Sequence, residues 1–176
     1  MKRESLIGFV MKNKSLGLAA IGALVLAILL AIHFWGPTNH ATQAQLTNSS
    51  LLNSRFGVAN LTIHSTDANS SYFVYLATNI SQQEEGYMNV STLGNCDNRG
   101  NCLGMLFVFQ DEMNLCFWMN NTRIPLKQTW INYDGFPVTS YNGTPFSNQV
   151  VCNYGKYVLE TNPNFTLSGY ITLNYS

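Results

Sequence analysis

Hydrophobic residues are distributed very unevenly along the chain, and the first block is the most apolar. Residues 16–35 form a run of twenty residues without a charged side chain. A helix of that length spans the hydrocarbon core of a bilayer, which is about 30 Å thick. Lys12 and Lys14 precede the run, so the positive-inside rule predicts a signal anchor with residues 1–15 in the cytoplasm.

A cleavable signal peptide is the alternative to a retained anchor. Residues 41–44, with the sequence ATQA, offer small side chains for a cleavage site. The apolar run is longer than the usual signal-peptide core of about 7–15 residues, which favours a single-pass membrane protein. Under either reading, residues 37–176 lie outside the cytoplasm, tethered to the cell membrane or secreted after cleavage.

The pattern changes twice after the apolar run. Residues 36–54 are polar, small and aperiodic, which predicts a linker. From residue 55 to 176, short runs of β-branched and aromatic residues alternate with Gly, Asn, Asp and Pro. Ser81 and Glu84 match a capping box that predicts a short helical turn ending at Gly86, and Asp134-Gly135 predicts a hairpin. Strands are expected at residues 56–64, 71–77, 104–109, 116–119, 128–133, 137–141, 157–160 and 169–174.

Short strands at this spacing are typical of a β-sandwich, a jelly roll or a small barrel. The predicted fold is therefore a compact, mainly β domain over residues 55–176, preceded by one transmembrane helix. All four cysteines lie in this domain and allow three pairings. Cys96 and Cys102 bracket a short loop, which favours a local disulfide and leaves Cys116 with Cys152. Their spacings do not resemble those of a zinc site, and no metal is expected.

Asparagine sequons support the extracytoplasmic assignment. Nine Asn-x-Ser/Thr triplets follow residue 37, and one of them starts at Asn120 inside a densely apolar motif. Their density is above that expected by chance and predicts an N-glycosylated surface protein, and a generic Asn-rich composition is the alternative. The other candidate glycosylation sites are Asn48, Asn60, Asn69, Asn79, Asn89, Asn142, Asn164 and Asn174.

Charge excludes one broad class of partner. The formal net charge is zero, but residues 1–35 carry four basic side chains and one acidic one, whereas the remainder carries five basic and eight acidic ones. Nucleic-acid binding needs a dense basic surface, which this mildly acidic domain lacks. Phosphate-binding glycine motifs are also absent from the sequence, and no cofactor is expected.

Five sequence blocks occur in a recognisable order: EEGYMNVSTL, GMLFVF, CFWMNNTRIPL, WINYDGFPV and KYVLE. Together they resemble the domain of unknown function 192 family over about residues 56–174. The resemblance implies a mostly β fold of sandwich or jelly-roll type, commonly exported, with no established activity. The family has Arg where this chain has Gln83 and Asp where it has Lys127, so we hypothesise that a structural ion pair has been lost.

Candidate chemistry is sparse in the outer domain. His64 is the one histidine beyond residue 54, and no nucleophile elbow accompanies it, which argues against a hydrolytic triad. Neighbouring carboxylates such as Glu84 and Glu85 splay around a turn, which does not suit paired acid–base catalysis. Glu160, near the end of a predicted strand, is the better single carboxylate because it could point into a groove.

Aromatic residues recur in successive predicted strands, and alternation sends half of them into the core. They could instead line a concave groove for a glycan or peptide of the cell envelope. The candidate ligand-binding residues are Trp118, Asn121, Thr122, Arg123 and Glu160. The sequence thus favours a membrane-anchored binding or envelope-maintenance module. An enzyme acting on envelope glycan or peptide and a purely structural surface protein are the alternatives.

Overall fold

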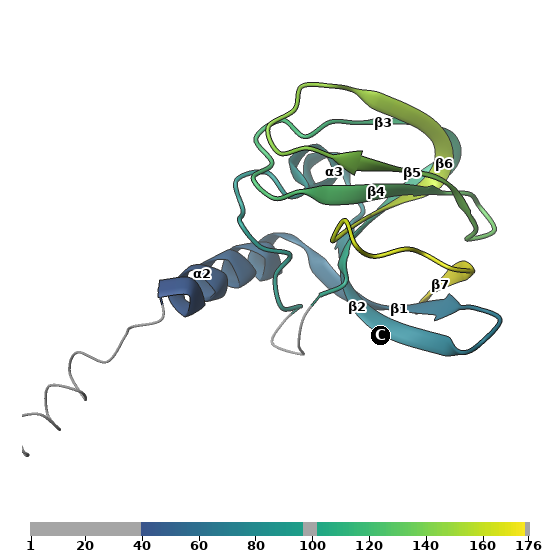
Figure 1. Ribbon diagram of the computed structural model, residues 1–176, viewed down its shortest axis with the longest axis horizontal. Coiled ribbons are helices and arrows are strands. Elements are labelled where there is room, and N and C mark those ends of the chain that lie inside the picture. The colour runs from purple at the N-terminus through teal and green to yellow at the C-terminus, as the bar shows by residue number, and fades with distance from the viewer. Residues whose placement is uncertain (1–39, 97–101, 175–176) are drawn as a thin grey trace, which may run out of the picture. The chain divides into compact units, whose positions relative to one another are not determined.

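The computed structural model describes residues 40–96 and 102–174, with side chains described from Asn48 onward (Figure 1). The predicted anchor at residues 16–35 and the cytoplasmic segment before it lie outside these residues. Among the described helices, none combines the length and the apolar character needed to cross a membrane. The elements are α2 (His40–Arg55), β1 (Gly57–His64), β2 (Asn69–Ala77), α3 (Ile80–Glu85), β3 (Gly104–Phe117), β4 (Leu126–Ile131), β5 (Pro137–Gly143), β6 (Val151–Thr161) and β7 (Tyr170–Asn174).

The strands form one mixed sheet in the order β5-β4-β6-β3-β2-β1-β7, which curves into a half-barrel (Figure 1). Neighbouring strands are antiparallel except for β2 and β3, which run parallel. The prediction of a mainly β domain is confirmed. The second packed sheet that a sandwich requires is not found, because all seven described strands belong to the same sheet.

Strand β3 corrects the prediction most clearly. Residues 104–109 and 116–119 were expected as two strands, but Gly104–Phe117 is one long strand that pairs with β6 along both of its ends. The pairing register shifts between Val108 and Met113, so a bulge bends the strand there. The mostly polar sequence QDEMN at the bend is largely exposed to solvent. It interrupts the apolar pattern, so the sequence does not show that the strand is continuous.

Helix α2 corrects the predicted linker at residues 36–54. Leu52 is buried in the core and Ser49 is buried beside it. The Asn53 side chain accepts a hydrogen bond from the Tyr75 hydroxyl of β2 at 2.7 Å. Polar residues dominate the helix, so tertiary packing of its last turn, not amphipathic periodicity, accounts for the helical state.

The short helix α3 forms where it was predicted, but with a different cap. Asn79 is the N-cap residue and accepts a hydrogen bond from the Gln82 backbone at 3.0 Å, while Gln82 Oε1 accepts one from the Thr78 backbone at 3.0 Å. The predicted cap at Ser81 is therefore wrong by two residues. The helix ends at Gly86, as predicted, with a φ of 45°.

The two faces of the sheet bury separate apolar clusters. One contains Trp130, Phe107 and Met105 and packs against α2 and the segment after α3. The other contains Leu106, Ile131 and Leu159 and is closed by Phe165 and Leu167 of the segment before β7. Strict alternation along β6 places Val158 and Glu160 on the first face and Leu159 on the second.

Both expected disulfides are present. Cys96 bonds to Cys102, with Cα atoms 5.2 Å apart, and Cys116 bonds to Cys152, with Cα atoms 4.0 Å apart. Cys116 and Cys152 are direct partners in the β3–β6 register, so the bridge links the two longest strands beside the bend.

Candidate functional site

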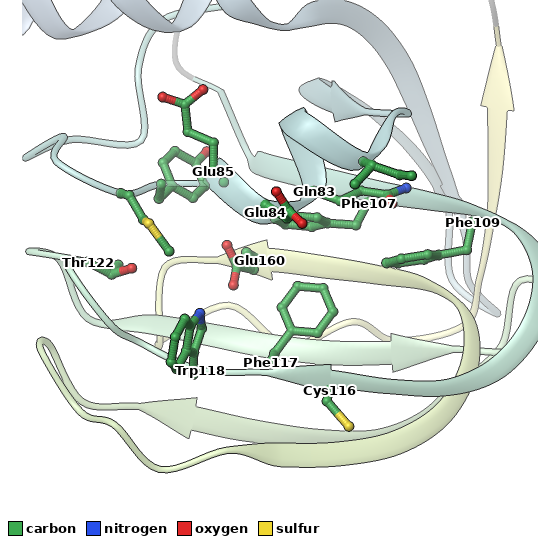
Figure 2. A pocket seen from close by; sticks show the side chains of 14 residues that line it. Gln83, Glu84, Glu85, Phe107, Phe109, Cys116, Phe117, Trp118, Thr122 and Glu160 are labelled. Atoms are coloured by element: carbon green, nitrogen blue, oxygen red, sulfur yellow. The ribbon is translucent and has the colours of Figure 1, made fainter.

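A pocket of about 310 Å³ opens on the first face of the sheet, beside α3 (Figure 2). Helix α3 and the residues after it form one wall, and β3 with the Trp118 segment forms the other. Figure 2 shows the Glu160 carboxylate among the lining side chains, with Phe117 and Trp118 on one side of it and α3 on the other. The pocket therefore joins segments that lie far apart in the sequence.

Backbone hydrogen bonds fix the loop that follows β3. Asn121 adopts a φ of 55°, and its carbonyl accepts from the Asn89 backbone at 2.9 Å. The Thr122 carbonyl accepts from the Phe146 backbone at 3.0 Å. This turn buries Met119 and leaves Trp118 48% exposed in the pocket wall.

Glu160 is the most unusual side chain of the pocket because it is only 4% exposed. Gln128 pairs with it across β4 and β6 and donates to Glu160 Oε1 from Nε2 at 3.0 Å. Met105 pairs with it on the other side, across β3. The backbone register thus holds the carboxyl group in the centre of the sheet, on the pocket side.

Burial changes the acid–base behaviour of this site. Desolvation raises the pKa of Glu160 from 4.5 to about 7, although the Gln128 hydrogen bond opposes the shift. Burial also raises the pKa of the nearby Tyr87 hydroxyl, with a further contribution from the Glu160 charge. Glu160 can therefore be neutral or ionised near neutral pH, which is a property of proton-transfer and ligand-sensing groups.

Aromatic rings supply most of the apolar lining. Phe107 and Phe117 meet edge to face with centroids 4.9 Å apart, and Phe109 meets Phe117 at 6.5 Å. Phe117 also contacts the buried Trp130, with centroids 5.9 Å apart. The exposed side of this cluster faces the pocket, while its buried side belongs to the core.

The structure brings three of the five candidate ligand-binding residues together. Trp118, Thr122 and Glu160 line the pocket, whereas Asn121 and Arg123 do not. Both of the latter are exposed, and the carbonyl of Asn121 is used to fix the loop. The two predicted roles, an aromatic groove and a packed core, are therefore divided between the two sides of one aromatic cluster.

Sequence reasoning missed the contribution of α3. Gln83, Glu84 and Glu85 line the pocket, and the ion pair between Arg55 and Glu85 fastens this helix to the end of α2. The block EEGYMNVSTL, which contributes to the family resemblance, was the available signal. It could not show which strands the short helix faces.

The hypothesis of a lost ion pair between positions 83 and 127 is not supported. Gln83 donates to the Val108 carbonyl at 2.8 Å and lines the pocket. Lys127 donates to the Phe165 carbonyl at 2.6 Å, on the face that the segment before β7 covers. Gln128, the neighbour of Lys127, is the residue that faces Glu160.

His64, the one histidine beyond residue 54, lies away from the pocket. His64 stacks on Tyr170 with centroids 4.6 Å apart and bonds to Thr172, so it belongs to β1 and β7 and not to the pocket. Among residues 40–96 and 102–174, no three His, Cys, Asp or Glu side chains are grouped so that they could hold a metal ion.

Solved structures similar to the chain include two bacterial proteins. A Sinorhizobium meliloti protein, provisionally named a transcription regulator, is 24% identical, with a TM-score of 0.57 over 67% of this chain and 95% of that one. A Novosphingobium aromaticivorans protein of unknown function is 22% identical, with a TM-score of 0.56 over 67% of this chain and 85% of that one. At these identities the similarity shows the fold alone.

Sequence comparison gives a more specific result. The comparison with curated proteins gave no match. A sequence profile of DUF192, described as "Uncharacterized ACR", matches residues 61–172, which include every strand from β2 to β6 and the whole pocket. The profile covers well over half of the chain. The chain therefore belongs to the DUF192 family.

Proposed function

We propose that this domain is an extracytoplasmic binding module that takes a small part of an envelope peptide or glycan into the pocket beside α3. The observation that carries the proposal is the buried Glu160 on the pocket floor, which lies beneath an aromatic wall and has no ion-pair partner among the described residues. Ligand sites are typically concave and apolar, with few polar groups at fixed positions. A structural surface protein has no need of a buried carboxyl group in an open pocket.

The extracytoplasmic location in this proposal rests on three supports. The apolar run at residues 16–35 is long enough for an anchor, and two disulfides suit an oxidising compartment. Several sequon asparagines are exposed and could carry glycans: Asn69, Asn89, Asn142, Asn164 and Asn174. Mass spectrometry of the protein from its native membrane would test this part. A chain that carries neither the anchor segment nor any glycan would contradict it.

A binding screen tests the pocket itself. Full-length protein would be probed against arrays of envelope peptides and glycans, together with Trp118→Ala and the control Tyr133→Ala. Both side chains are exposed, but only Trp118 lines the pocket. We expect Trp118→Ala to lose the binding and Tyr133→Ala to retain it. An array with no ligand, or equal binding by both variants, would contradict the proposal.

An enzyme acting on envelope material is the second candidate, and the pKa of about 7 for Glu160 is the observation that favours it. A carboxyl group with such a pKa can serve as a general acid, and Glu84 supplies a second carboxylate in the same pocket. Glu160→Gln would abolish hydrolysis of envelope material under this proposal. Unchanged hydrolysis by that variant would remove the candidate.

A further inference from the structure

The pocket has an unbalanced charge. Three carboxylates line it, those of Glu84, Glu85 and Glu160, and no lysine, arginine or histidine is among the lining residues. Arg55 pairs with Glu85 from outside the pocket. Glu84 and Glu160 have no ion-pair partner in the part of the chain that the structure describes. The site is therefore negative and would repel anionic ligands.

The hydrogen-bonding capacity of the Glu160 carboxylate is also only partly used. Its single hydrogen bond among the described residues reaches Oε1 from Gln128, which leaves Oε2 without a protein donor. The Oε1 atom of Gln128 is itself buried without a partner. A buried carboxylate that lacks a counter-charge is unfavourable unless another group replaces its lost hydration. A cation that enters the pocket would supply that group.

The neutral lining distinguishes between kinds of ligand. Phe107, Phe109 and Phe117 offer ring surfaces without hydrogen-bonding groups. Three uncharged polar side chains of the lining, Gln83, Tyr87 and Thr122, already donate to backbone carbonyls. Few groups remain for the many hydroxyls of a sugar. Apolar walls with a carboxylate on the floor suit an apolar stem that ends in a positive charge.

We propose that the pocket takes an organic cation, an ammonium or guanidinium group on an apolar stem, with the charged head against Glu160 and the stem between Phe117 and Trp118. This inference rests on the proposed binding function and narrows its ligand class. A basic side chain of a peptide and a free amine present the same chemistry. A neutral glycan does not.

Small matched probes test this assignment on the full-length protein. Benzylammonium, benzyl alcohol and phenylacetate have similar shapes and differ in charge, and N-acetyl-lysine N-methylamide represents a cation carried by a peptide. Ligand-observed NMR would give the affinities, with Glu160→Gln as the variant and Asp67→Asn as the control. Asp67 is exposed in the β1–β2 loop, so its substitution changes the net charge equally but leaves the pocket intact.

We expect benzylammonium to bind roughly tenfold more tightly than benzyl alcohol, with phenylacetate weakest, as an ion pair in a desolvated site requires. Glu160→Gln should abolish the preference, and Asp67→Asn should retain it. Binding of N-acetyl-lysine N-methylamide would identify a peptide as the source of the cation. If benzylammonium binds and N-acetyl-lysine N-methylamide does not, the ligands are free amines. Equal binding of the alcohol and the ammonium would overturn the cation assignment alone. Failure of every probe would also overturn the cation assignment, and failure of the peptide and glycan arrays in addition would overturn the binding function.

Discussion

The two faces of the sheet are built from the same strands but differ in how they are completed. On one face, Leu159 and its apolar neighbours are covered by Phe165 and Leu167. On the other face, Glu160 lies on the floor of an open pocket. Leu159 and Glu160 are consecutive residues of β6, but the first lies in a sealed core and the second lies in the candidate site. The comparison indicates that the sealed face contributes mainly stability, whereas the pocket face gives up some stability to keep a carboxyl group accessible.

The largest effect should come from the sealed face. Leu159→Ala removes a fully buried side chain and should lower the free energy of unfolding by about 2–5 kcal/mol. Phe109→Ala removes a half-buried ring from the pocket wall and should cost about 1 kcal/mol. Urea unfolding of both full-length variants would measure the difference. Equal losses would show that the pocket wall is as much a part of the core as the opposite face.

The disulfide beside the pocket should come next. Replacing both Cys116 and Cys152 by alanine should lower stability by about 4 kcal/mol, because the bridge closes a long loop in the unfolded chain. The same replacement of Cys96 and Cys102 should cost only about 2 kcal/mol, since the loop is short. Unfolding curves of the two double variants provide the test. A larger loss for the Cys96–Cys102 pair would contradict the loop-length argument.

Glu160→Gln should stabilise the protein, but only where the carboxyl group would be ionised. Because the folded pKa of about 7 exceeds the unfolded value of 4.5, the folded state holds this proton more tightly. Wild-type stability is then lost as the pH rises from 4.5 to 7, by up to about 3 kcal/mol.

The charged and titratable groups that face Glu160 are Glu84, Glu85 with its partner Arg55, and Tyr87. Stability curves at pH 4 and pH 8 should show no gain from Glu160→Gln at the lower pH and the full gain at the higher one. Asp67→Asn should show neither change. A destabilised Glu160→Gln variant at pH 8 would mean that the charge has a compensating partner.

The smallest effect on stability is expected for Trp118→Ala. Trp118 is about half exposed, so its removal should change the free energy of unfolding by less than about 1 kcal/mol. Trp130→Ala is the matched contrast, because Trp130 is fully buried and donates to the Leu115 carbonyl at 2.9 Å. Thermal unfolding would compare the two. A strongly destabilised Trp118→Ala variant would assign this ring to the core.

Much of the fold follows from local sequence signals, and the exceptions have physical causes. The β-branched and aromatic runs of β1 and β2 and the Asp134-Gly135 hairpin predict their elements correctly because the information is local. Helix α2 escapes prediction because Leu52 stabilises it through contact with distant strands. Strand β3 was predicted as two separate strands because the residues at its bulge are mostly polar and exposed, which interrupts the apolar pattern.

The site was predictable only in part for the same reason. Its position near a strand end suggested Glu160, and the aromatic motif suggested Trp118. That α3 lies opposite them depends on the parallel pairing of β2 with β3, which brings the helix between these strands over the pocket. Asn121 and Arg123 share the motif with Trp118, but the turn at Asn121 directs them away from the pocket lining.

The ionisation of Glu160 is the most direct test of the account. Carboxyl ¹³C NMR of the full-length protein would follow this group across pH, first alone and then with benzylammonium. The account predicts a pKa of about 7 for the free protein, and a fall when the cation binds because pairing favours the ionised form. A pKa near 4.5 in the free protein, or no change with benzylammonium bound in the pocket, would contradict it.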